Sequence, residues 1–72
     1  MEPYKKDHWQ RLGEIYIQAQ KFAEAIPAYE KAAEIDPGDI RIWEVLKDLY
    51  SGSNMPDKAQ QAEAKMQELK KL

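Results

Sequence analysis

The sequence predicts an all-α fold made of two antiparallel helix-turn-helix hairpins stacked on each other. Three observations support this fold class. Apolar residues between the turns follow the helical period, and Pro, Gly and Asn cluster where those stretches end. The same residue types also recur 34 positions apart, since Trp9, Leu12, Tyr16 and Ala25 are followed by Trp43, Leu46, Tyr50 and Ala59. A repeat of this length is typical of stacked copies of one small helical unit.

We expect a first helix over about residues 7–19. Trp9, Leu12 and Tyr16 are spaced by three and four residues, so they fall near one face of a helix. Gly13 lies in the middle of this helix, where glycine costs up to about 1 kcal/mol relative to alanine. We interpret it as the point where a second helix approaches closely.

A short turn at Gln20–Lys21 leads into a second predicted helix, residues 22–35, whose apolar residues again follow the helical period. The small side chains of Ala25 and Ala32 are expected to face Gly13. Pro27 is interpreted as lying near the first turn, where amide donors lack partners inside the helix, so only a slight bend is expected.

The segment 36–39, Asp-Pro-Gly-Asp, is predicted to end the second helix and turn the chain. Asp39 is a plausible N-cap for a third helix over about residues 40–51. In that helix Trp43 and Tyr50 repeat the apolar face of the first helix, and we expect them to press the two hairpins together.

A fourth helix is predicted over about residues 56–70, with Asn54 as its cap and Pro56 at its first position. The second hairpin departs from the first at three positions, where Lys47 replaces glycine, Glu63 an aromatic residue and Met66 an alanine. The last unit of a stack has no neighbour to cover it, so its outer face should be polar. We therefore interpret the fourth helix as a cap and the second hairpin as the looser half.

These features resemble the tetratricopeptide repeat family. The first copy carries its signature residues, which are Trp9, Leu12, Gly13, Tyr16, Ala25, Tyr29, Ala32 and Pro37. The resemblance implies a single domain, residues 1–72, with a first repeat at 6–39 and a second, capping repeat at 40–72. It also implies that the hairpins form a short right-handed solenoid, and that the chain is a scaffold that binds other proteins.

In this family the first helix of each repeat lines a concave groove that holds extended or helical peptides. The resemblance carries this role to Asp7, Gln10, Glu14, Ile17, Gln18, Arg41, Glu44, Asp48 and Ser51. The set is mostly acidic with one arginine, so a protein or peptide partner with Lys or Arg side chains is favoured by charge. A generic hydrated surface is the competing interpretation.

One subset of the family grips the C-terminal carboxylate of chaperones with lysine and asparagine side chains in this groove. The matching positions here hold Gln10, Glu14 and Val45, and a carboxylate would meet Glu14 instead of a lysine. The sequence therefore departs from the carboxylate clamp, and we do not expect that activity.

The composition argues against several other functions. A formal net charge of −2 and an isoelectric point near 5.3 disfavour binding to nucleic acid, which depends on basic patches. No apolar run reaches membrane-spanning length, and there is no cysteine to form a disulfide or a zinc site. We expect no membrane interaction and a cytoplasmic location.

Catalytic residues are scarce. His8 is the single histidine, and Ser51 and Ser53 lie in a turn without a partner base, whereas a nucleophile needs an oriented base. Acidic pairs such as Glu14 with Asp48 should stay hydrated in so thin a fold. We expect no enzyme activity, no metal site and no cofactor.

Two alternatives to an adaptor remain open. Stacked repeats usually need about three copies for stability, so a homodimer could supply a missing neighbour through Tyr4, Trp9 or the first helix. The chain could also be a designed or excised repeat fragment with no independent activity.

Overall fold

The computed structural model describes residues 5–71 and confirms the all-α fold. It contains four helices: α1 (Lys6–Gln18), α2 (Phe22–Ile35), α3 (Ile40–Gly52) and α4 (Pro56–Lys70). Each lies within one residue of its predicted bounds. Tyr4, one of the residues considered for self-association, lies outside the described residues.

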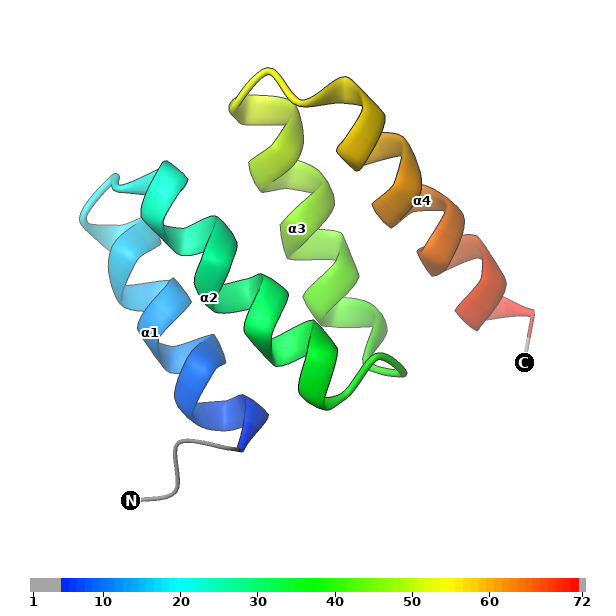
Figure 1. Ribbon diagram of the computed structural model, residues 1–72, viewed down its shortest axis with the longest axis horizontal. Helices are drawn as coiled ribbons and strands as arrows, with labels where there is room; N and C mark the ends of the chain where they lie inside the picture. The colour runs from blue at the N-terminus through cyan, green and yellow to red at the C-terminus, as the bar shows by residue number, and fades with distance from the viewer. Residues whose placement is uncertain (1–4, 72) are drawn as a thin grey trace.

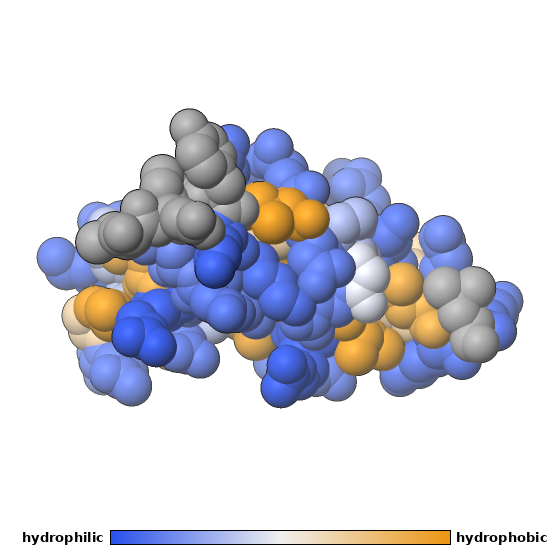
Figure 2. Space-filling view, turned by 90° about the horizontal axis from the view of Figure 1, so that it is seen from below, coloured by the Kyte–Doolittle hydropathy of each residue, from blue (hydrophilic) through white to orange (hydrophobic). Residues whose placement is uncertain are grey.

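The helices are arranged as two hairpins in a flat slab (Figure 1). Helix α1 packs on α2, α3 packs on α4, and α2 packs on α3 to join the hairpins. The Cα atoms span 33 × 27 × 14 Å. Seen from below, the slab is largely hydrophilic, and its hydrophobic side chains lie in separate patches (Figure 2). Helices α2 and α3 therefore each have two partner helices and together form the centre of the fold.

The two hairpin turns are built alike, 34 residues apart. Gln20 and Asn54 take the left-handed conformation, with φ of 62° and 59°. The next amide in each turn reaches back five residues: Lys21 N–H donates to the Tyr16 carbonyl and Met55 N–H to the Tyr50 carbonyl, both at 2.8 Å. Such a bond satisfies a carbonyl left unpaired at a helix end.

Asn54 is consequently not the cap that the sequence predicted. The N-cap residue of α4 is Met55, which makes no side-chain cap hydrogen bond. Asn54 instead supplies the left-handed residue that reverses the chain, a conformation that asparagine tolerates better than most residues. Pro56 does take the first helical position, as predicted.

The turn between the hairpins is held by side chains. Asp39 caps α3 by accepting a hydrogen bond from the Arg41 N–H at 3.0 Å, as predicted. The Lys6 ammonium at the start of α1 bonds to Asp36 at 2.6 Å and to Asp39 at 2.9 Å. Trp43 Nε1 donates to the Pro37 carbonyl at 2.8 Å. The turn thus joins α1 and α3 as well as ending α2.

The contact at Gly13 differs from its predicted form. The atoms nearest to Gly13 belong to the Tyr29 ring, not to Ala25 or Ala32. A Cβ added at Gly13 would lie 2.5 Å from Tyr29 Cδ2 and nearer still to Cε2, closer than carbon atoms approach. Ala25 and Ala32 are fully buried in the core. The glycine therefore makes room for a flat ring, whereas we had expected small residues on both sides.

Pro27 also differs from expectation in its place. Helix α2 begins at Phe22, so Pro27 lies in the second turn and removes the hydrogen bond that would reach the Ala23 carbonyl. The helix nevertheless runs on to Ile35 without a break. Pro27 is exposed, so water can reach the carbonyl that loses its partner.

The second hairpin replaces the glycine–ring contact with an ion pair. Lys47 and Glu63 occupy the positions equivalent to Gly13 and Tyr29, and their charged groups lie 3.5 Å apart with both side chains about two-fifths exposed. Met66, at the position of Ala32, is buried. Lys47 thus reaches water, and its ammonium also has a carboxylate partner.

Candidate functional site

A polar hollow lies between α1 and α3, with Tyr29 of α2 at its floor. Its lining residues from the two outer helices are Asp7, Gln10, Arg11, Glu14, Arg41, Glu44 and Val45. Those from each helix are spaced by three or four residues, which places them on one face. The first helix of each hairpin thus presents a row of polar side chains to this hollow.

An apolar hollow continues from the polar one. It is lined by Ile17, Phe22, Val45, Asp48, Leu49 and Gly52. Val45 lines both hollows, so together they form one groove along α1 and α3, which we call the α1/α3 groove. Phe22, at the start of α2, is 47% exposed, and Ile17 and Val45 are partly buried. The groove therefore has a polar end and an apolar end.

The predicted groove residues mostly meet there. The polar end brings together Asp7, Gln10, Glu14, Arg41 and Glu44, and the apolar end holds Ile17 and Asp48. Gln18 and Ser51 line neither hollow. Both are exposed near the ends of their helices, where the groove has already turned toward Phe22 and Gly52.

Sequence reasoning missed six groove residues, which are Arg11, Phe22, Tyr29, Val45, Leu49 and Gly52. Arg11 follows Asp7 by four positions, so helical spacing alone could have placed it there. Tyr29 is a signature residue of the repeat, and Phe22 and Leu49 are apolar residues of their helices; only the packed structure shows that all three line the groove. With Arg11 present, the polar end has two arginines beside three carboxylates and is less acidic than predicted.

The floor of the polar end is a neutral hydroxyl. Burial raises the pKa of Tyr29, and the nearby Glu14 carboxylate raises it further. The phenol therefore stays protonated at neutral pH and can donate or accept a hydrogen bond. Arg41 is 80% exposed and lies 3.7 Å from Asp39, so its guanidinium remains largely available to a ligand.

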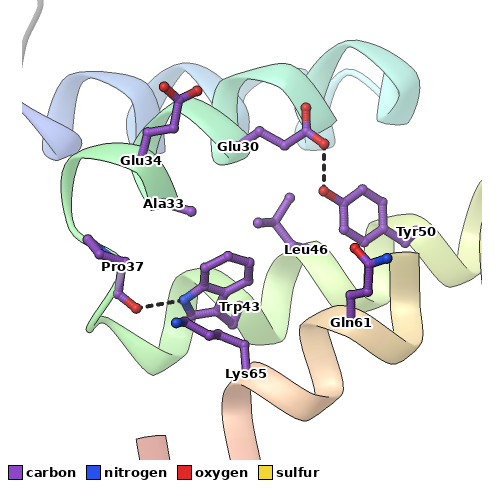
Figure 3. A pocket seen from close by; sticks show the side chains of 9 residues that line it. All are labelled: Glu30, Ala33, Glu34, Pro37, Trp43, Leu46, Tyr50, Gln61 and Lys65. Atoms are coloured by element: carbon purple, nitrogen blue, oxygen red, sulfur yellow. Dashed lines mark hydrogen bonds between the residues drawn. The ribbon is translucent and has the colours of Figure 1, made fainter. Parts of the chain in front are cut away.

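A second hollow lies on the other side of the slab, where α2, α3 and α4 meet (Figure 3). Within it the Tyr50 hydroxyl donates to Glu30 at 2.6 Å. Lys58 lies 3.8 Å from the same carboxylate and 5.7 Å from the centre of the Tyr50 ring. Burial raises the pKa of the Tyr50 hydroxyl, and the hydrogen bond to Glu30 raises it further. We interpret this region as the seam between the hairpins, because its polar groups bind one another.

Tyr50 and Trp43 hold the hairpins together as predicted. Tyr50 reaches from α3 to α2, and Trp43 lies against the α2–α3 turn with its indole N–H bonded there. Leu46, between them, is 1% exposed and belongs to the central core.

The described residues form no cluster suited to metal chemistry. Within residues 5–71, no group of three His, Cys, Asp or Glu side chains could hold a metal ion. His8 lies edge-on to the Trp9 ring, with centroids 5.2 Å apart. No helix in that part of the chain is both long and apolar enough to span a bilayer.

Comparison with known proteins agrees with the geometry. A family model for the tetratricopeptide repeat matches residues 9–39, which cover most of the first hairpin and the turn after it. No curated protein matches the chain.

Proposed function

Because residues 9–39 are a tetratricopeptide repeat, we propose that the chain is a protein-interaction module that binds a partner segment in the α1/α3 groove. Repeats of this family generally act as protein-interaction scaffolds. The second hairpin lies outside the matched residues. It shares the 34-residue register, the left-handed turn residue and the Trp–Leu–Tyr face, which supports treating both hairpins as one binding unit.

The observation that carries the proposal is the continuity of the groove. Its polar and apolar ends share Val45, and Phe22 is about half exposed at the apolar end. Ligand sites in proteins are usually hollows with a largely apolar lining and a few polar groups beside it, and the α1/α3 groove combines both.

The two ends contribute unequally to affinity. An exposed ion pair with Glu14 or Glu44 is worth about 0–1 kcal/mol. Burying a leucine-sized side chain against Ile17, Phe22 and Leu49 is worth about 1.5–3 kcal/mol. The partner we propose therefore carries one apolar anchor, with Lys or Arg side chains placed to meet the carboxylates of the polar end.

The proposal is tested by titrating the isotope-labelled chain with a synthetic peptide that has one leucine flanked by lysines. Amide resonances of Glu14, Val45 and Leu49 should shift. The same peptide with serine in place of leucine should bind at least tenfold more weakly, given the anchor energy above. A version with glutamates in place of the lysines should lose less. Shifts confined to α4 would overturn the proposal.

Variants of the chain complete the test. Phe22→Ala should weaken binding of the leucine peptide by about tenfold, and Glu14→Gln by about two- to threefold. Gln60→Ala, on the exposed side of α4, is the matched control and should bind as the original chain does. Equal affinity of all four proteins would place the peptide elsewhere.

A further inference from the structure

The outer side of the first hairpin carries an apolar hollow away from the groove. Trp9, Leu12 and Tyr16 of α1 line it with Pro27 and Ala28 of α2, and the charged side chains of Glu24 and Lys31 complete the lining. We call this surface the N-terminal face.

The equivalent surface of the second hairpin is covered by α2. The same three residue types recur 34 positions later as Trp43, Leu46 and Tyr50. They lie under the last turns of α2 and line the hollow where α2, α3 and α4 meet, together with Glu30 and Ala33 of α2 (Figure 3). The Tyr50 hydroxyl is hydrogen-bonded to Glu30. Within residues 5–71, the Tyr16 hydroxyl has no such partner, and no helix covers the N-terminal face.

The two ends of the stack have opposite character. On α2, Ile26 and Ala33 are buried in the contact with the second hairpin. The equivalent residues of α4, Gln60 and Gln67, are polar and exposed. The α4 end is therefore suited to water, as a capping unit should be, whereas the N-terminal face is apolar.

The charges on the N-terminal face are arranged symmetrically. Glu24 and Lys31 are seven residues apart on α2, about 10.5 Å along the helix axis. Pro27 and Ala28 lie midway between them. If two copies of α2 cross antiparallel at this midpoint, Glu24 of each copy meets Lys31 of the other, so one contact forms two ion pairs.

We propose that the N-terminal face is the interface of a two-fold symmetric homodimer, in which the apolar hollows meet and Glu24 pairs with Lys31 of the second copy. A two-fold contact uses the same surface on both subunits and closes on itself. Head-to-tail stacking would bury the glutamines of α4 against Trp9 and Leu12, which disfavours an open filament. The α1/α3 groove, on other faces of α1 and α2, stays accessible in this dimer.

Sedimentation equilibrium at low salt tests the proposal. The unmodified chain should associate to a dimer with rising concentration. Glu24→Lys places two lysines against each other twice and should weaken the dimer by about tenfold. Lys31→Glu should do the same, and the double variant E24K/K31E should restore the original affinity because the pairs are reversed.

The controls separate this specific pairing from total charge. Glu24→Lys brings the formal net charge from −2 to zero, so nonspecific repulsion would fall while the proposed pairing is lost. Glu68→Lys makes the same charge change on the exposed side of α4 and should not weaken the dimer. Circular dichroism should show an equal helical content in all variants.

Three outcomes would overturn the proposal. One is a monomer at every concentration, and another is a dimer with the same strength in all variants. The third is a monomer whose Tyr16 and Leu12 resonances shift when a peptide with the sequence of residues 22–37 is added, which would assign the face to a helix of another protein. Because these shifts arise outside the α1/α3 groove, failure here is distinct from failure of the peptide-binding proposal.

Discussion

The two hairpins have the same backbone plan but close their helix pairs by different means. In the first, Gly13 has no side chain and the Tyr29 ring lies directly on its backbone. In the second, Lys47 and Glu63 at the same positions form a partly exposed ion pair at 3.5 Å. The first contact depends on shape and excludes water, while the second tolerates water. One repeat register can therefore close its helix pair either by a ring packed on a glycine or by a partly hydrated ion pair.

Removing the ring should have the largest effect on this comparison. Tyr29→Ala should lower the free energy of unfolding by about 3–5 kcal/mol, because it leaves a cavity between α1 and α2. A loss of that size is comparable to the total stability of a small domain. Thermal unfolding followed by circular dichroism measures it, with Glu63→Ala at the equivalent position as the matched variant. Equal losses at the two positions would contradict the assigned difference.

Adding a methyl group on the other side of the same contact should come next. Gly13→Ala drives a Cβ into the Tyr29 ring and should cost about 1–3 kcal/mol, despite the better helix propensity of alanine. Lys47→Ala, the same product at the equivalent position, should change stability by less than about 1 kcal/mol, since it removes one exposed ion pair.

Chemical denaturation of Gly13→Ala and Lys47→Ala measures the change in the free energy of unfolding at each of the two equivalent positions. If Gly13→Ala were neutral, the close approach of Tyr29 to the α1 backbone would be wrong. A Gly13→Ala change made together with Tyr29→Leu should cost less than the sum of the single changes, because the clash has gone.

The starts of α1 and α3 differ as well, and Asp39 tests that difference. Asp39 caps α3, whereas Lys5 at the equivalent position makes no side-chain cap bond. Asp39→Ala should cost about 0.5–2 kcal/mol through loss of the cap. Asp39→Asn keeps a capping oxygen but loses the charge that faces Lys6, so it should cost less.

The difference in stability between the original chain and Asp39→Asn should depend on pH because of the Lys6–Asp39 ion pair. The hydrogen bond from Lys6 holds the pKa of Asp39 below its ordinary value. Its stabilising contribution is therefore present above the unfolded pKa, near about 4, and is lost as the pH falls through the folded value. The gap in stability between the original chain and Asp39→Asn should shrink in that acidic range. A gap unchanged down to the folded pKa would exclude the charge contribution.

The smallest expected effect concerns the two hairpin turns. Gln20 is held in the left-handed conformation, which glycine adopts without steric cost. Gln20→Gly should therefore stabilise the chain by up to about 1 kcal/mol. Asn54→Gly should gain less, because asparagine already tolerates this conformation. Thermal melts of the two single variants rank them. A larger gain at Asn54 would contradict this account of the turns.

Much of the fold could be predicted from periodicity alone. The spacing of Trp9, Leu12 and Tyr16 defined a helix face, and its recurrence at Trp43, Leu46 and Tyr50 defined the stack. Helix bounds followed from Pro56 and from the 36–39 turn, where the local chemistry leaves few options.

The predictions that failed concern residues whose role depends on the three-dimensional path of the chain. Asn54 suits both a cap and a left-handed turn, and only the path of the chain chooses between them. Nothing in the sequence pattern pairs Lys6 with Asp36 and Asp39, some thirty residues away, and only the fold brings them together. In the groove, most predicted residues met as expected, but Tyr29 was missed because one ring can fill the core and line the surface.

The positions of α2 and α3 at the centre of the stack set the order in which this molecule should unfold. Helix α4 packs chiefly on α3, so it can detach while the Tyr29–Gly13 contact stays intact. Helices α2 and α3 each pack on two neighbours, so neither can leave without exposing both at once. Amide hydrogens of α4 should thus exchange with solvent through local opening, whereas those in the middle of α2 should exchange only when the entire chain unfolds.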